Sequence, residues 1–264
     1  MISRSLKVEL ERAVMTPRFA VSILLPCLFY LASGADELFQ LWDSPHVDVL
    51  HFADFLGNVG SFSMMLILAA CFPCATAYCD DLRHQYLRCQ LLRCKTSIYC
   101  AAKIITAALV GAVASAGGLL LFILLLGLRF PFTLPGSGLY DSAVMAQATH
   151  YWGELLVKGG GAAYFGGMLL CCGLYGALWG AAGIAVSGLI PNPFVALFTP
   201  FLLESVLRMA PLPPLLKLRV HLFGHFNWGG WGQSILFSVG YMVLLIIFCG
   251  IFFYLCVKRR LQDG

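Results

Sequence analysis

The ionisable side chains inside apolar stretches are the residues most able to do chemistry in this chain. Glu204 lies within the apolar run 194–207, and Arg208 follows it by about one helical turn. Burying an ionisable side chain in a membrane costs roughly a few kcal/mol or more, so such residues are functional candidates. We interpret the pair either as part of a membrane path or gate, or as a structural ion pair on one helix face.

A second group of polar residues lies in a basic, amphipathic connector, residues 80–103, and indicates binding to another surface. Asp80 or Asp81 can cap a helix there. The candidate contact residues are Asp80, Asp81, Arg83, Tyr86, Leu87, Arg88, Leu91 and Arg93. Its apolar members can fill a pocket on a partner, while the arginines pair with acidic rims. The alternative is a basic helix held against anionic lipid headgroups.

Other reactive residue types form no recognisable catalytic or metal site. His221 and His225 are four residues apart, but Leu222 stands where a zinc protease needs glutamate. A second loose group contains His46, Asp48, His51 and Asp54. We interpret the 11 cysteines as small apolar residues in packed helices, including the C-x-x-C pair at Cys71 and Cys74. We therefore expect no catalytic residue, no bound metal and no nucleic-acid partner.

The elements that position these residues follow from composition. Of 264 residues, 60% are hydrophobic and 11% are charged, and the mean hydropathy is +0.84. Because a soluble domain would lower that mean, we predict one all-α polytopic membrane domain over residues 1–264 with six transmembrane helices. The predicted spans are 19–35, 59–78, 104–128, 161–186, 194–207 and 235–257. An amphipathic helix over 3–16 is predicted to lie on the membrane surface, and 208–234 to be extracellular or re-entrant.

The distribution of basic residues predicts the orientation. Twelve lie on the side that we assign to the cytoplasm: Arg4, Lys7, Arg12, Arg18, Arg83, Arg88, Arg93, Lys95, Lys103, Lys258, Arg259 and Arg260. The other side has five: Arg129, Lys158, Arg208, Lys217 and Arg219. Six spans with both termini in the cytoplasm fit this asymmetry.

The fourth predicted span is rich in small residues. Gly173, Gly176, Gly180 and Gly183 are separated by three or four residues. Small residues at this spacing allow two helix backbones to approach closely. We predict that they pack against another helix of the bundle or a second copy.

The connector and the order of elements resemble the membrane subunit of ABC type-2 exporters. The likeness lies in a surface helix, two spans ending in an acidic pair, an amphipathic helix, and Lys-Thr-Ser-Ile-Tyr99-x-x-x-Lys103 opening the third span. As a layout it covers nearly the whole chain. Members of that family often have a glycine soon after the acidic pair, where this chain has His84 and Gln85.

The resemblance implies that the helix within 80–93 is a cytoplasmic coupling helix that docks on a separate ATP-hydrolysing subunit. This chain has no Gly-Lys dipeptide and hence no phosphate-binding loop, so ATP and Mg²⁺ are expected on that partner. Two copies of the ABC ATP-binding subunit, a second permease copy (the same chain or a related one) and membrane lipids are the expected partners. The expected location is the bacterial plasma membrane.

The expected activity is therefore export of a hydrophobic or amphipathic substrate, such as a lipid, drug or peptide, including protection against bacteriocins. Two other classes stay open: an intramembrane enzyme such as a protease or lipid transferase, and a non-transporting membrane scaffold or sensor. Co-purification of an ATPase separates the first from both.

Overall fold

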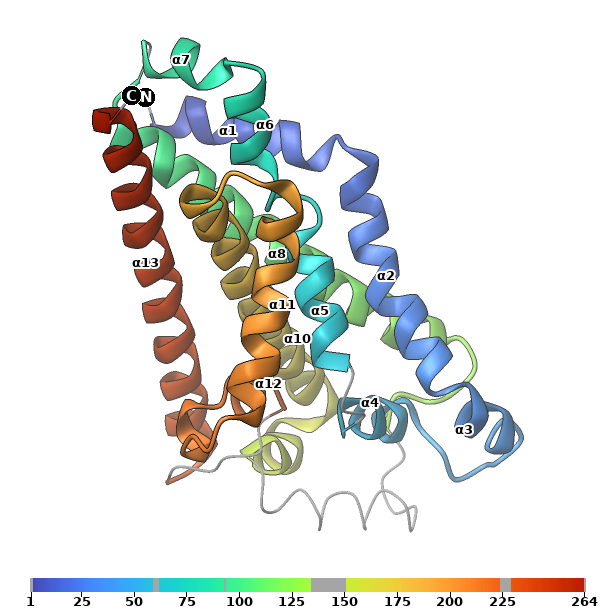
Figure 1. Ribbon diagram of the computed structural model, residues 1–264. Helices are drawn as coiled ribbons and strands as arrows, with labels where there is room; N and C mark the ends of the chain where they lie inside the picture. The colour runs from blue at the N-terminus through green and yellow to red at the C-terminus, as the bar shows by residue number, and fades with distance from the viewer. Residues whose placement is uncertain (1, 59–61, 93, 134–150, 224–228, 264) are drawn as a thin grey trace.

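The computed structural model describes residues 2–58, 62–92, 94–133, 151–223 and 229–263. Its regular elements are α1 (Ile2–Val14), α2 (Pro17–Ser33), α3 (Ala35–Gln40), α4 (Val49–Asn58), α5 (Phe62–Cys71), α6 (Ala77–Arg83), α7 (Tyr86–Leu91), α8 (Thr96–Gly127), α10 (Tyr151–Leu189), α11 (Pro193–Met209), the 3-10 turn η1 (Pro214–Leu216), α12 (Leu218–Phe223) and α13 (Trp231–Asp263). No strand occurs among the described residues, so the predicted all-α class is confirmed there (Figure 1).

In the part of the chain that the structure describes, three helices are long and apolar enough to cross a membrane. They are α8 over its whole length, α10 over Gly160–Leu189 and α13 over Gly232–Gln262. These helices correspond to the third, fourth and sixth predicted spans, and they suggest a membrane protein. The crossings predicted at 19–35, 59–78 and 194–207 stay predictions.

The chain bends between α1 and α2. Arg4–Val14 and Pro17–Ser33 meet at 63°. Pro17 begins α2 because its fixed φ and missing N–H suit the first turn of a helix, and the Thr16 hydroxyl donates to the Ala13 carbonyl at 2.8 Å. As a result, α1 lies across the end of the bundle at which α13 ends (Figure 1).

The predicted span at 59–78 is not one continuous helix. Its described part is divided into α5 and α6 by a turn that contains Pro73. Proline cannot donate the backbone hydrogen bond that a helix interior needs, which explains the break. At the end of α5, the Cys71 thiol donates to the Trp179 carbonyl at 3.2 Å and so links this turn to α10.

The helix predicted within 80–93 is also interrupted. Asp80 and Asp81 end up inside α6, and α7 is a separate helix of six residues. Between them, Gln85 has φ of 55°, a left-handed conformation that glycine adopts far more readily. This turn is at the position where members of the exporter family that the connector resembles often have glycine.

The centre of the bundle is α10, which packs against α8, α13, α11 and α5. The four predicted packing glycines are buried there. A Cβ added at Gly180 would lie 2.5 Å from the Ala107 carbonyl oxygen of α8, whereas one at Gly173 would meet nothing nearer than 3.5 Å. Close approach of α10 to α8 therefore requires glycine at position 180.

The opposite situation holds for α13, whose apolar surface is mostly uncovered. Only 11% of the 18-residue apolar stretch of α13 is buried inside the molecule. Leu244, Phe248 and Leu255 are exposed. A surface of this kind requires a lipid or protein neighbour.

Candidate functional site

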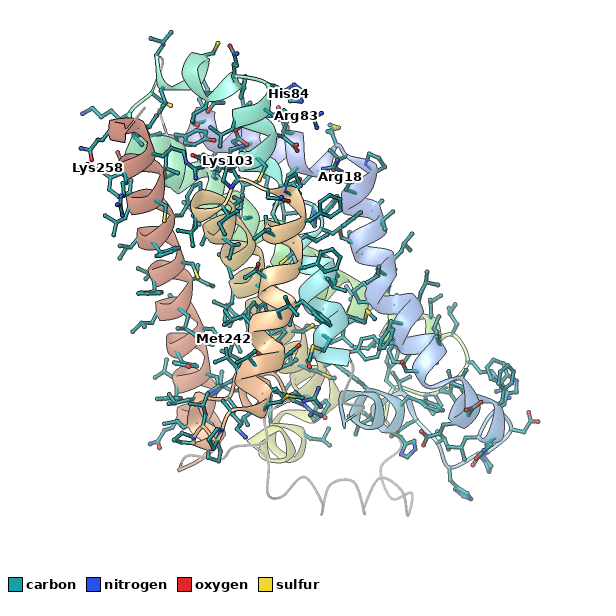
Figure 2. All side chains as sticks on the ribbon, viewed as in Figure 1. Arg18, Arg83, His84, Lys103, Met242 and Lys258 are labelled. Carbon is teal, nitrogen blue, oxygen red and sulfur yellow. The ribbon has the colours of Figure 1, made fainter. Side chains whose placement is uncertain are left out.

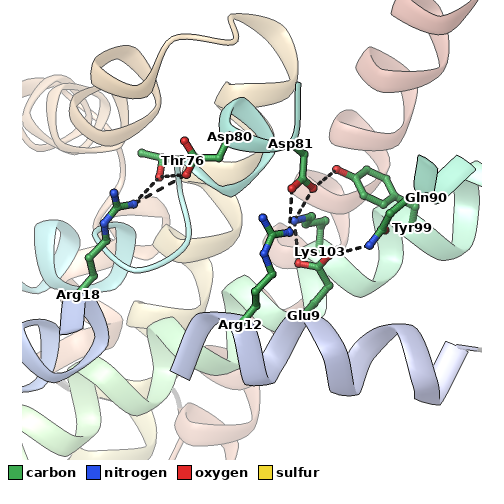
Figure 3. A network of polar contacts seen from close by, with 9 residues as sticks. All are labelled: Glu9, Arg12, Arg18, Thr76, Asp80, Asp81, Gln90, Tyr99 and Lys103. Atoms are coloured by element: carbon green, nitrogen blue, oxygen red, sulfur yellow. Dashed lines mark hydrogen bonds and ion pairs between the residues drawn. The ribbon is translucent and has the colours of Figure 1, made fainter. Parts of the chain in front are cut away.

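A network of charged side chains joins four helices at the end of the bundle where α1 lies (Figure 3). Lys103 of α8 is at its centre. The Lys103 ammonium nitrogen lies 2.7 Å from an oxygen of Glu9 in α1 and 2.7 Å from Oδ2 of Asp81 in α6. Tyr99, one turn before Lys103, donates its hydroxyl to the same Asp81 oxygen at 2.8 Å.

Two further contacts attach α1 to the connector. Arg12 of α1 donates to Oδ1 of Asp81 at 2.9 Å, and its guanidinium lies 4.8 Å from the centre of the Tyr86 ring in α7. Gln90 of α7 donates to Glu9 at 3.5 Å, a long hydrogen bond. Both carboxylates of the network therefore have partners on other helices.

Three of the four charged side chains of the network are buried, and that of Arg12 is partly exposed. The side chains of Asp81, Lys103 and Glu9 are 0%, 2% and 4% exposed. With Arg12 they form two cations and two anions, so their formal charges cancel. A buried ion pair is a weak source of net stability, but removing one partner strands the other charge. The network consequently fixes how α1, α6 and α8 lie relative to one another.

An exposed set of contacts lies beside this network. Arg18 of α2 is 3.9 Å from Asp80 and donates to the Thr76 hydroxyl at 3.2 Å. Between the two sets is a cavity of about 320 Å³ whose polar wall includes Glu9, Arg12 and Asp80. This cavity opens at the same end of the bundle as the connector.

The predicted contact residues of the connector do not share one environment. Arg83 is exposed, and Asp80, Tyr86 and Leu91 are half-buried. Leu87 is buried. The structure does not describe Arg93 or the side chain of Arg88.

Asp81 is the clearest departure from the predicted surface. Its carboxylate is enclosed by Arg12, Tyr99 and Lys103, so in this conformation it has no surface to offer a partner. An acidic pair in sequence predicts a helix cap, but it does not say which of the two carboxylates turns inward.

The sequence marks Arg12 and Lys103 as basic residues on the cytoplasmic side, but it does not indicate that they pair with Asp81 and Glu9. Lys103 and Tyr99 were conspicuous as part of the motif that opens the third span, where a lysine inside an apolar helix needs a counter-ion. Glu9 and Arg12 belong to the amphipathic helix at the start of the chain. The distance of 94 positions between Glu9 and Lys103 leaves no local pattern that could pair them.

A second polar cavity, of about 340 Å³, lies where α11 is followed by α12. It is lined by Glu204, Leu207, Arg208, Lys217, Leu218, Arg219 and Val220. Glu204 is 2% exposed, and the hydroxyl of the buried Tyr175 lies beside its carboxylate. The predicted pair Glu204 and Arg208 thus lines a common cavity, to which the segment after α11 adds two cations.

The candidate histidines have protein partners. The His221 ring contacts the Leu215 carbonyl oxygen at 2.7 Å and the Ser238 hydroxyl at 3.0 Å, and burial lowers its pKa despite the bond to Leu215. His51 lies 2.9 Å from Glu37. His225 is outside the described residues. Within the described ranges, no cluster of three or more metal-ligand side chains occurs.

Comparison with protein-family models, curated proteins and solved structures finds no match to this chain.

Proposed function

We propose that this chain is the membrane (permease) subunit of an ATP-driven exporter of the ABC type-2 kind. In this proposal, two copies of a separate ATP-binding subunit hydrolyse ATP with Mg²⁺, and a second permease copy completes the transporter. The chain resides in the bacterial plasma membrane with both termini in the cytoplasm. The exported substrate is hydrophobic or amphipathic: a lipid, a drug or a peptide such as a bacteriocin.

The observation that carries the proposal is the buried network around Lys103. It connects the short connector helices to α8, which is one of the three long apolar helices. A partner that moves α6 or α7 would therefore move α8 and α1 with it, since separating the buried charges is costly. Transmission of this kind is what a coupling element between an ATPase and a membrane bundle requires.

The surface of the connector supports docking of a protein. Arg83 is exposed at this end of the bundle (Figure 2). Leu92 is 89% exposed although it is a large apolar residue. An exposed leucine and an exposed arginine on the same connector match an interface that combines an apolar anchor with charged contacts. Anionic lipid headgroups alone would account for the exposed basic side chains but not for the exposed leucine. A protein partner with an apolar pocket and an acidic rim would account for both features.

Site-specific photo-crosslinking tests the proposal. A crosslinking amino acid at Leu92 should capture an ATP-binding subunit in native cells. Leu128 is the matched control because it is also a leucine, is 85% exposed and lies at the opposite end of α8. Capture from position 92 and not from 128 is expected. Absence of an ATP-binding protein from the adducts at 92 would count against the proposal, and an adduct with lipid only would favour the headgroup alternative.

A further inference from the structure

An open apolar groove lies between the two long helices α8 and α13. It has a volume of about 330 Å³, and its walls include Ile104 and Ile105 of α8 and Ile247 and Ile251 of α13. Three of these four isoleucines are exposed, and Ile104 is buried. Both helices are long and apolar enough to cross a membrane, so in a bilayer this groove would open toward the lipid hydrocarbon.

A glycine of α13 makes room in the groove. A Cβ added at Gly250 would lie 3.5 Å from Cγ2 of Ile104, which is an ordinary van der Waals distance. The approach of the two helices therefore does not require glycine at this position, and the missing side chain leaves space that a larger residue would fill. Gly240, on the same helix, does not line the groove, and a Cβ there would meet nothing within 4 Å.

The dimensions of the groove favour a hydrocarbon chain as its occupant. Its α8 wall runs from Ser97 to Ile105, which is about 12 Å at a rise of about 1.5 Å per residue. The hydrocarbon of one leaflet is roughly 15 Å thick, half of the ~30 Å core of a bilayer. A helix with its side chains is about 10–12 Å wide and fills about 1,000 Å³ over that length. A helix could therefore cover the groove but not enter it.

The groove is polar at one end only. Ser97 and Tyr254 line the end that lies toward the chain termini (Figure 1). Lys95 is exposed two residues before Ser97, and Lys258 is exposed one turn after Tyr254. Neither lysine forms an ion pair within the described part of the chain. An apolar channel that ends beside exposed cations matches the chemistry of an anionic membrane lipid.

We propose that this groove holds one acyl chain of an anionic phospholipid from the membrane leaflet on the side of the chain termini, with the lipid phosphate beside Lys95. The inference requires that α8 and α13 lie in a membrane. It does not rest on the proposed ATP-binding subunit or on export, so either proposal can fail without the other.

Photo-crosslinking with a defined lipid tests the groove in the purified full chain. Phosphatidylglycerol with a diazirine on one acyl chain is added in mixed micelles, and mass spectrometry of peptides locates the adducts. We expect them within 97–105 and 247–254. Gly250→Leu should abolish these adducts by filling the groove, whereas Gly240→Leu should leave them unchanged. Ala101→Leu fills the groove from α8 and gives a second test should Gly250→Leu fail to fold.

The headgroup is tested separately. At subsaturating lipid, Lys95→Gln should lower the adduct yield by about five-fold, taking one basic side chain near an anionic headgroup as ~1 kcal/mol. Lys217→Gln is the matched control, because Lys217 precedes α12 at the other end of the bundle (Figure 1). Phosphatidylcholine with the same diazirine chain should label the groove less than phosphatidylglycerol does.

Three results would overturn the site. The first is adducts spread evenly over the exposed faces of α8 and α13, as for ordinary surrounding lipid. The second is groove labelling that survives both Gly250→Leu and Ala101→Leu in variants that unfold at the wild-type temperature. The third is equal labelling by phosphatidylglycerol and phosphatidylcholine that Lys95→Gln leaves unchanged, which would remove the anionic headgroup from the proposal.

Discussion

Replacing Lys103 by methionine isolates the contribution of the buried network. Methionine keeps most of the apolar length of lysine, so packing changes little while the ammonium group is lost. Two contacts of 2.7 Å disappear, and the carboxylates of Glu9 and Asp81 stay buried with Arg12 as their only cation in the network. Loss of one member of a buried ion pair costs about 3–5 kcal/mol, and we expect a decrease in unfolding free energy of that size.

A matched lysine elsewhere provides the control. Lys7 also contacts a glutamate, Glu11, at 3.8 Å, but its side chain is 76% exposed. An exposed pair one helical turn apart contributes about 0.3–0.5 kcal/mol, so Lys7→Met should be nearly neutral. The two variants thus remove the same chemical group from a buried and an exposed environment.

Unfolding free energies can be measured in mixed micelles by titration with a denaturing detergent, with tryptophan fluorescence as the signal. Adding Glu9→Gln to Lys103→Met should restore part of the lost stability, because it neutralises one stranded carboxylate. The reasoning is refuted if Lys103→Met and Lys7→Met agree within about 0.5 kcal/mol, the usual range for surface substitutions.

Three further predictions concern other parts of the bundle. Gly180→Ala should destabilise the chain by about 1–3 kcal/mol because its Cβ would lie 2.5 Å from a backbone oxygen, while Gly173→Ala should be neutral or slightly stabilising in the same unfolding assay. Gln85→Gly should raise the melting temperature, since a side chain at φ of 55° costs about 1–2 kcal/mol that glycine avoids; an unchanged or lower value would contradict strain at this turn. His221 should make stability fall as the pH drops below about 6.5, the ordinary histidine pKa. Burial lowers the pKa of His221 in the folded chain, so the unfolded chain takes up the proton first. His221→Gln should flatten this pH dependence and His84→Gln, at an exposed position, should not.

The helical class and the long apolar helices could be predicted because their signals are local. Apolar runs of sufficient length predicted α8, α10 and α13, and the helical period of the first residues predicted α1 to within about two residues. The glycines of α10 were recognised by spacing alone, although only the structure shows that Gly180 meets the backbone of α8.

The errors came from interruptions and from distant contacts. Pro73 divides a continuous apolar run, and a proline inside such a run is a sequence signal for a break in the helix. Gln85 in a left-handed conformation gives no sequence signal, because glutamine is not a typical residue for that turn. The pairing of Glu9 with Lys103, and the addition of Lys217 and Arg219 to the cavity of Glu204, depend on how the helices pack.

The most direct test of the proposed function is purification of the tagged chain in mild detergent from its native cells, followed by an assay for ATP hydrolysis. The account predicts a co-purifying ATP-binding subunit at a one-to-one ratio. Arg83→Glu should reduce that subunit, while Lys258→Glu, at an exposed position at the same end of the bundle, should retain it (Figure 2). A chain that purifies folded but without ATPase activity in several detergents would contradict the exporter assignment.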